Sequence, residues 1–78
     1  MSLETLIRVR LSLATRITSR RDDLGMTQGD LAVRIGKSRP AVANIEAGRQ
    51  SVTIDVLADI ADVLECRMAY LLGERKQP

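Results

Sequence analysis

Arginine is the residue type in this sequence best suited to binding a ligand, and it supplies ten of the twelve basic residues. Its planar fork of donors suits bidentate hydrogen bonds to phosphates and to base edges. Residues 1–50 carry nine basic and five acidic side chains, whereas residues 51–78 carry three and five. The net charge of +2 therefore divides into +4 and −2. This asymmetry points to nucleic acid as a partner, with a solvated surface of mixed charge as the alternative.

The sequence lacks the residues that most catalytic sites, metal sites and disulfides require. Histidine is absent, which excludes Ser-His-Asp and Cys-His catalysis and any metal site built on histidine. Cys66 is the only cysteine, so an internal disulfide and a cysteine-cluster zinc site are excluded, and a reducing, cytoplasmic setting is favoured. No apolar run approaches the roughly 18 residues of a membrane span, and the N-terminal residues do not follow the signal-peptide pattern. We therefore expect no enzyme, no metal, no cofactor and no membrane segment.

The spacing of apolar residues predicts an all-α protein with five helices in a single domain over residues 1–78. Hydrophobic residues make up 45% of the chain, and because Tyr70 is the only aromatic residue the core must be aliphatic. The helices are expected at about residues 3–23, 28–35, 38–47, 53–64 and 68–72, and the tail at 74–78 is expected to fray.

Hydroxyl side chains indicate where these helices begin. Thr27 is expected to cap the second helix, and Asp30 three residues later completes a capping box. Ser38 and Thr53 are the expected caps of the third and fourth helices. The residues expected to be buried in these two helices are Ala41, Val42, Ile45, Ile54, Leu57, Ile60, Ala61 and Leu64.

Two of the expected helices form a distinct unit over about residues 28–47. Ala32 is small enough to let two helices cross closely, and Gly36 allows the chain to reverse within three or four residues. Val42 and Ile45 anchor the second helix of the unit and leave its other face free. This spacing is typical of a helix-turn-helix unit, whose second helix enters the DNA major groove.

A wider pattern surrounds this unit: LGMTQGDLA from Leu24, IGKSRPAVANIEAGR from Ile35, TIDVLADIADVL from Thr53 and YLLG from Tyr70. Together these runs resemble the Cro/C1-type (XRE-type) helix-turn-helix regulators over about residues 13–73. The resemblance implies a five-helix, lambda-repressor-like DNA-binding domain. The first helix is extended beyond the family minimum by a segment that holds Leu3, Leu6, Ile7, Val9 and Leu11.

The resemblance assigns base contacts to the exposed face of the second helix of the unit. Arg39 would donate to O6 and N7 of guanine, and Asn44 would form the bidentate pair with N6 and N7 of adenine. Pro40 and Ala43 have no side-chain donors and would contact thymine methyl groups. Plain exposure to solvent is the alternative for all four residues.

Phosphate contacts are expected around the same unit, with solvated loop residues as the alternative. The residues are Gln28, Thr27, Lys37, Ser38, Arg49 and Gln50. Gln28 matches a phosphate contact of the family, and the backbone N–H groups beside Thr27 and Ser38 face an anion at a helix N-terminus. Arg21 and Glu46 match a pair that ties the first helix to the third in the family, and a phosphate contact is a further possibility for Arg21.

The C-terminal part departs from the family pattern and contains the expected dimer interface. Glu65 stands where the family usually has glycine, which implies a non-glycine left-handed residue or a different exit from the fourth helix. Cys66 is expected to act as a small buried hydrophobe, with a redox role as the alternative. The interface candidates are Val56, Val63, Met68 and Tyr70 together with the N-terminal extension. For Val56 and Val63, a wider buried stripe is an equal alternative.

The sequence thus predicts a homodimeric regulator that binds a palindrome in double-stranded DNA without a cofactor or small-molecule ligand. The resemblance extends to phage repressors and to controller proteins of restriction–modification systems. The alternative is an antitoxin-type module that neutralises a toxin partner and regulates its own synthesis.

Overall fold

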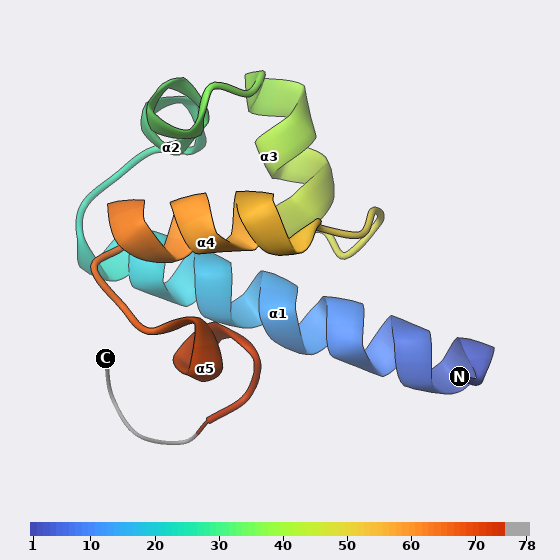
Figure 1. The fold of residues 1–78 in the computed structure, drawn as a ribbon. Helices are drawn as coiled ribbons and strands as arrows, with labels where there is room; N and C mark the ends of the chain where they lie inside the picture. The colour runs from blue at the N-terminus through green and yellow to red at the C-terminus, as the bar shows by residue number, and fades with distance from the viewer. Residues whose placement is uncertain (75–78) are drawn as a thin grey trace.

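Capping hydroxyl groups begin four of the five helices in the computed structural model, which describes residues 1–74. The helices are α1 (Leu3–Asp23), α2 (Gln28–Ile35), α3 (Arg39–Glu46), α4 (Ile54–Val63) and α5 (Met68–Leu71) (Figure 1). The oxygens of Ser2, Thr27, Ser38 and Thr53 accept hydrogen bonds from backbone N–H groups in the first turns of α1 to α4. The predicted all-α, five-helix fold is confirmed. Within the expected fraying tail, residues 75–78 lie outside the described residues.

Helix α2 begins and ends with the expected chemistry. The Thr27 hydroxyl accepts from the Asp30 N–H at 3.0 Å, and the Asp30 carboxylate accepts from the Thr27 N–H at 2.9 Å. These backbone and side-chain bonds from Thr27 lower the pKa of Asp30. Gly36 ends α2 in the left-handed region at φ 69°, where a side chain would be strained. The predicted capping box at the start of α2 and the glycine turn at its end are therefore confirmed.

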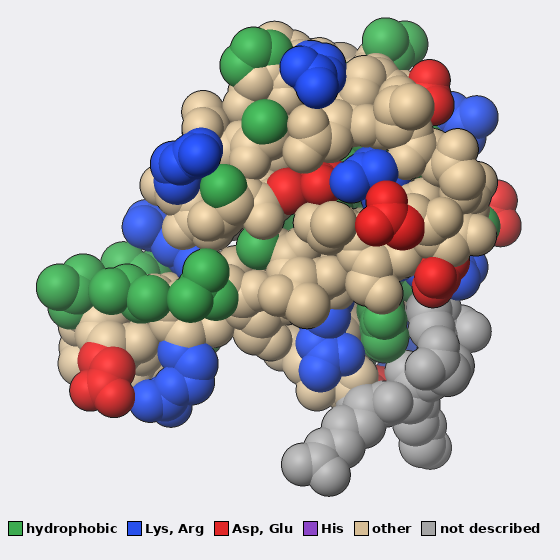
Figure 2. All heavy atoms as spheres, turned by 180° about the vertical axis from the view of Figure 1, so that it is seen from behind, with side chains coloured by type: hydrophobic (Ala, Val, Ile, Leu, Met, Phe, Trp, Pro, Cys, Tyr) green, Lys and Arg blue, Asp and Glu red, His purple; other side chains and the backbone are tan. Residues whose placement is uncertain are grey.

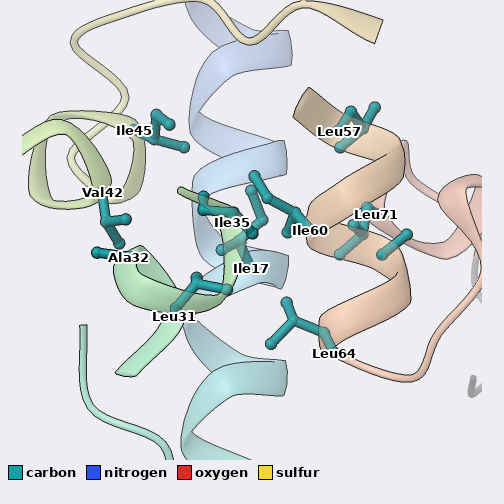
Figure 3. Packing of buried hydrophobic residues seen from close by; sticks show 11 residues of the cluster. Ile17, Leu31, Ala32, Ile35, Val42, Ile45, Leu57, Ile60, Leu64 and Leu71 are labelled. Atoms are coloured by element: carbon teal, nitrogen blue, oxygen red, sulfur yellow. The ribbon is translucent and has the colours of Figure 1, made fainter. Parts of the chain in front are cut away.

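One aliphatic core joins all five helices (Figure 3). Helix α2 packs against α3 and α4, while α1 packs against α3 and α5. The buried side chains that meet at the centre are Ile17, Leu31, Ala32, Ile35, Val42, Ile45, Leu57, Ile60, Ala61, Leu64 and Leu71. None of the helices within residues 1–74 combines the length and the apolar character that crossing a bilayer requires.

Two residues of the predicted core lie outside it. Ile54 is 65% exposed, because the first turn of α4 passes the edge of the core and its side chain lines an open groove with Val9 and Leu72. Ala41 is only partly buried, whereas Val42 and Ile45 are fully enclosed. Periodicity assigned the correct face of each helix, but it did not show where neighbouring helices stop covering that face.

The exit from α4 depends on a long-range contact. Glu65 adopts φ 55°, the only positive φ of a non-glycine residue among the described positions. Arg20 of α1 donates from Nε to the Leu64 carbonyl at 2.8 Å and from Nη2 to the Glu65 carbonyl at 3.3 Å. A cation at a helix C-terminus also interacts favourably with the helix dipole. Arg20 therefore stabilises a turn that usually needs glycine.

Replacing Glu65 with glycine is expected to raise the free energy of unfolding by about 0.5–1 kcal/mol, because it removes the left-handed strain of a residue with a Cβ atom. Urea denaturation would measure the change. Glu65→Ala is the matched control, since it removes the charge and keeps the Cβ, and it should give no such gain. Equal stabilisation by alanine and glycine would show that charge, and not backbone strain, limits stability here.

The first helix projects beyond the other four at its N-terminal end (Figure 1). We call residues 3–11 of α1 the arm. The Arg10 guanidinium joins the arm to the turn between α3 and α4, donating to the Ser51 hydroxyl at 3.1 and 2.7 Å. Leu11 lies so close to Gly48 that a Cβ added to Gly48 would be 2.8 Å from Leu11 Cδ2. The base of the arm is thus held against the turn that follows α3.

Candidate nucleic-acid interface

Helix α3 has one anchored face and one free face. Val42 and Ile45 are 1% and 5% exposed and hold the helix on the core. Arg39 and Pro40 are exposed in its first turn, while Ala43 and Asn44 are partly exposed further along. Pro40 costs no hydrogen bond at this point, because the first N–H groups of a helix have no partner within it. The four residues expected to contact bases therefore share the solvent side of one short helix.

Asn44 is held by a neighbour from the turn after α3. Arg49 donates from Nη1 to the Asn44 Oδ1 at 3.1 Å. An amide oxygen has two lone pairs, so Oδ1 retains one acceptor site, and both hydrogens of the amide nitrogen stay available. These are the groups that pair with N6 and N7 of adenine. Arg49 thus orients the amide without using its whole hydrogen-bonding capacity.

Some of the side chains expected to contact phosphates already make hydrogen bonds within the protein, and others do not. The hydroxyls of Thr27 and Ser38 cap α2 and α3, and Gln28 donates from Nε2 to the Glu46 Oε1 at 3.2 Å. The Thr27 N–H also donates, to Asp30 Oδ2, so the backbone N–H groups left for an anion are those of Gln28 and Ser38. Each capping hydroxyl keeps its O–H donor, and Gln28 Nε2 keeps one hydrogen. Lys37 and Gln50, by contrast, are exposed and make no side-chain hydrogen bond to any residue in the part of the chain that the structure describes.

Arg21 and Glu46 form a buried bidentate ion pair between α1 and α3. Arg21 Nε lies 2.7 Å from Glu46 Oε2 and Nη2 lies 2.9 Å from Oε1. Their side chains are 11% and 4% exposed. Arg21 also donates from Nη1 to the Met26 carbonyl at 2.7 Å. The geometry agrees with the structural role that the resemblance implied, and it fixes α3 relative to α1.

The ionisation of this pair follows from its hydrogen bonds. The hydrogen bond to Glu46 raises the pKa of Arg21 above its ordinary value, although burial acts against it. Burial also works to raise the pKa of Glu46, but hydrogen bonds from Arg21, Gln28 and Thr18 outweigh burial and lower that pKa. Both groups are therefore charged at neutral pH. The Glu46 carboxylate, on α3, accepts hydrogen bonds from side chains of α1 and α2 and so links the three helices.

The four interface candidates in α4 and α5 are only partly exposed. Val56, Val63, Met68 and Tyr70 all pack against the edge of the core. The Arg16 guanidinium lies 5.4 Å from the centre of the Tyr70 ring, a cation–π contact within the chain. Cys66 is also partly buried, and burial raises the pKa of its thiol despite the nearby charge of Arg20. A raised pKa disfavours the reactive thiolate.

Sequence reasoning missed two arginines with structural roles. Arg20 closes α4, and Arg10 ties the arm to the turn after α3. Their acceptors are more than 40 residues away in the chain, at backbone carbonyls and a serine hydroxyl. The one sequence signal for the role of Arg20 was the absence of glycine after α4, because it indicated that another contact must stabilise the end of that helix.

Comparison with known proteins agrees with this arrangement. Residues 17–71 match the HTH_3 helix-turn-helix family. Among solved structures, the clp gene regulator ClgR from Corynebacterium glutamicum is 30% identical with a TM-score of 0.80, over 82% of this chain and 68% of that chain. An HTH_3 family transcriptional regulator from Vibrio cholerae is 26% identical with a TM-score of 0.78, over 85% of this chain and 37% of that one. No curated protein matches the chain in sequence.

A third solved structure is similar to this chain over only part of its own length. The Fe(II) form of HppE is 27% identical with a TM-score of 0.79, over 83% of this chain but only 34% of the HppE chain. The likeness is thus confined to one part of that protein. The family match covers most of the present chain, and its helix-turn-helix unit is the one that exposes Arg39 and Asn44. The chain therefore belongs to the HTH_3 (XRE-type) helix-turn-helix family of DNA-binding transcriptional regulators.

Proposed function

We propose that the protein acts in the cytoplasm as a homodimer that binds a palindromic operator, with α3 of each copy in the major groove. The observation that carries this proposal is that α3 has one face anchored on the core and the opposite face exposed. Val42, Ile45 and Glu46 fix the helix from one side, and Arg39 and Asn44 extend from the other. A single short helix reaches few bases, so two copies with half-sites about 10 base pairs apart supply the specificity of an operator.

Regulation follows from where such an operator lies. A homodimer bound across a promoter would exclude the polymerase, as expected of a phage-type repressor or a restriction–modification controller. A reporter gene with the selected operator placed over its promoter tests this role. Expression should fall when the protein is supplied, and it should recover with the Arg39→Ala variant. Unchanged expression would contradict repression and would leave DNA binding to be judged by the selection experiment.

The central test is selection of bound sequences from a random pool of double-stranded DNA. We expect enrichment of a palindrome whose two halves are about one helical turn apart. The Arg39→Ala, Asn44→Ala double variant is the control and should enrich no sequence. A pool without enrichment by the unaltered protein would contradict the proposal and favour the antitoxin-type alternative. Enrichment of one half-site alone would support base reading and contradict the symmetric arrangement.

Lys37→Ala is expected to weaken binding to operator and unrelated DNA by the same factor. The reason is that an exposed lysine in the turn before α3 would contact a phosphate, which carries no sequence information. The slope of log affinity against log salt should become shallower by about 1. Titrations by fluorescence anisotropy at several salt concentrations would measure it.

Arg49→Ala serves as the comparison for Lys37→Ala. It should reduce the salt slope equally and, in addition, weaken operator binding more than unrelated binding, because it releases the Asn44 amide. Identical effects of both variants on the two DNAs would show that the Arg49 to Asn44 contact does not influence base reading.

A further inference from the structure

The arm exposes an apolar ridge that the rest of the chain leaves uncovered except at Leu11, which also contacts Gly48. Leu3, Ile7 and Leu11 are spaced by four residues and so share one face of α1. They are 72%, 48% and 51% exposed. Figure 2 shows hydrophobic side chains gathered along one edge of the projecting end of α1. Contiguous apolar surface of this kind on a small protein marks a contact site.

An apolar groove lies beside this ridge. It has a volume of about 320 Å³ and lies between the arm, the turn after α3 and the start of α4. Its lining includes Leu6 and Val9 from the arm with Ile54 and Leu72 from the body. Ile54 and Leu72 are 65% and 57% exposed. The groove therefore lies next to the ridge on the arm, and the ridge is the most exposed apolar face of the arm.

We propose that this face binds a second copy of the chain, with the two arms antiparallel and crossing at Ile7. In that arrangement Ile7 meets its own counterpart, and Leu3 of each copy meets Leu11 of the other. A two-fold axis makes such an interface self-complementary. The inference rests on the proposed function, since it names the surface by which the operator-binding dimer forms.

The charges beside the ridge favour a second copy over another occupant. Glu4 and Arg8 each follow a ridge residue, so they lie on the same flank of the arm. They form an exposed ion pair at 3.4 Å, with Arg8 71% and Glu4 85% exposed. A two-fold axis through Ile7 brings this flank against the same flank of the partner, so Glu4 of each copy lies near Arg8 of the other. The two Arg8 side chains also meet beside the axis, where each is paired with the Glu4 of the other copy. An apolar ridge whose flank is complementary to itself suits a copy of the same chain.

Charge reversal on the flank tests the arrangement through mixed dimers. Arg8→Glu alone places glutamates opposite each other, and Glu4→Arg alone places arginines opposite each other. Each variant should dimerise at least about tenfold more weakly than the unaltered protein, because like charges face each other across the axis. A mixture of the two should recover dimers, since every glutamate then faces an arginine. An effect within one chain, such as lost helicity, cannot produce this rescue.

Substitution of the ridge supplies the second measurement. Sedimentation equilibrium at micromolar concentration should give about twice the 8.6 kDa monomer mass for the unaltered protein. Ile7→Glu should sediment as a monomer and keep its circular dichroism spectrum. Val33→Glu is the matched control, because Val33 is 81% exposed on α2, away from the arm, and it should remain dimeric.

The outcomes separate this inference from the proposed function. A monomeric Ile7→Glu that still binds a single half-site, but loses cooperative binding to the palindrome, supports both. Dimeric Ile7→Glu, or no rescue in the mixture, overturns the arm interface while palindrome selection can still succeed. An unaltered protein that is monomeric both free and on DNA overturns the arm interface and the homodimer together, and it leaves the face to a different partner.

Discussion

Replacing Glu46 with alanine is expected to lower the free energy of unfolding by up to about 3 kcal/mol, because it breaks a largely buried ion pair and leaves Arg21 with only the exposed carboxylate of Asp22 as a counter-ion. A chain of this length has roughly 4–12 kcal/mol of stability in total, so the loss is a large fraction of it. Arg21 would keep its contact with Asp22 and the Met26 carbonyl while losing both bonds to Glu46. Gln28 would lose its acceptor as well. Urea denaturation followed by circular dichroism would measure the change.

Asp22→Ala is the matched control for Glu46→Ala. Its carboxylate lies 3.0 Å from the same arginine, but the Asp22 side chain is 65% exposed. Exposed pairs contribute about 0–1 kcal/mol, so this variant should unfold almost like the unaltered protein. If the two substitutions cost the same, burial of the Arg21 to Glu46 pair would not be the source of its stability.

The same pair predicts a dependence on pH. The pKa of Glu46 is lower in the folded protein than in the unfolded chain, so its contribution is fully present above the ordinary glutamate pKa. That contribution is lost as the pH falls through the lowered folded value. The stability difference between the unaltered protein and Glu46→Gln should therefore shrink as the pH falls from 7 to about 3. A constant difference over this range would contradict ionisation of Glu46 as its origin.

Replacing Arg39 with alanine is expected to weaken operator binding by about 1–3 kcal/mol, or roughly 5- to 150-fold, and to relax specificity at one base pair. Arg39 is exposed in the first turn of α3, and no side-chain hydrogen bond joins it to another of the described residues, so the guanidinium is available for a guanine edge. Its removal leaves the core contacts of α3 unchanged, and stability should be unaffected. Anisotropy titrations on operator, single-base variants and unrelated DNA would measure the loss.

Arg34→Ala provides the comparison for Arg39→Ala. Arg34 is also exposed, but it lies on α2, outside the helix that we propose reads bases. Its replacement removes the same charge and should alter affinity for operator and unrelated DNA by a similar, small factor. An equal loss for Arg39→Ala on all DNAs would reassign Arg39 to a phosphate. No loss at all would contradict entry of α3 into the groove.

The parts of this fold that sequence could predict are those that local chemistry determines. Thr27 with Asp30, Ser38 and Thr53 each satisfy N–H groups within the next three residues, so the caps of α2, α3 and α4 are legible from spacing alone. The turn at Gly36 can be predicted for the same reason. The free face of α3 followed from the two anchoring residues on its other side.

Contacts between distant segments were beyond such reasoning. Ile54 has the period of a core residue, but its exposure depends on where the neighbouring helices end. The use of Gln28 as a donor to Glu46 depends on the crossing of α2 and α3, which spacing does not specify. Arg20 and Arg10 find acceptors that no local pattern identifies. The hydrogen-bond partners of long, flexible side chains are thus the part of the structure that sequence reasoning cannot predict, because several acceptors lie within their reach.

Under the proposed function, the two faces of α3 allow operator preference to change independently of folding. The buried contacts that fix the helix come from Val42, Ile45 and Glu46, whereas positions 39, 40, 43 and 44 carry none of them. Mutations at those four positions can therefore accumulate without loss of the scaffold, and duplicated copies of such a regulator can diverge toward different promoters. The same separation makes the four positions exchangeable by grafting from a relative of this fold, with stability as the property that should stay constant.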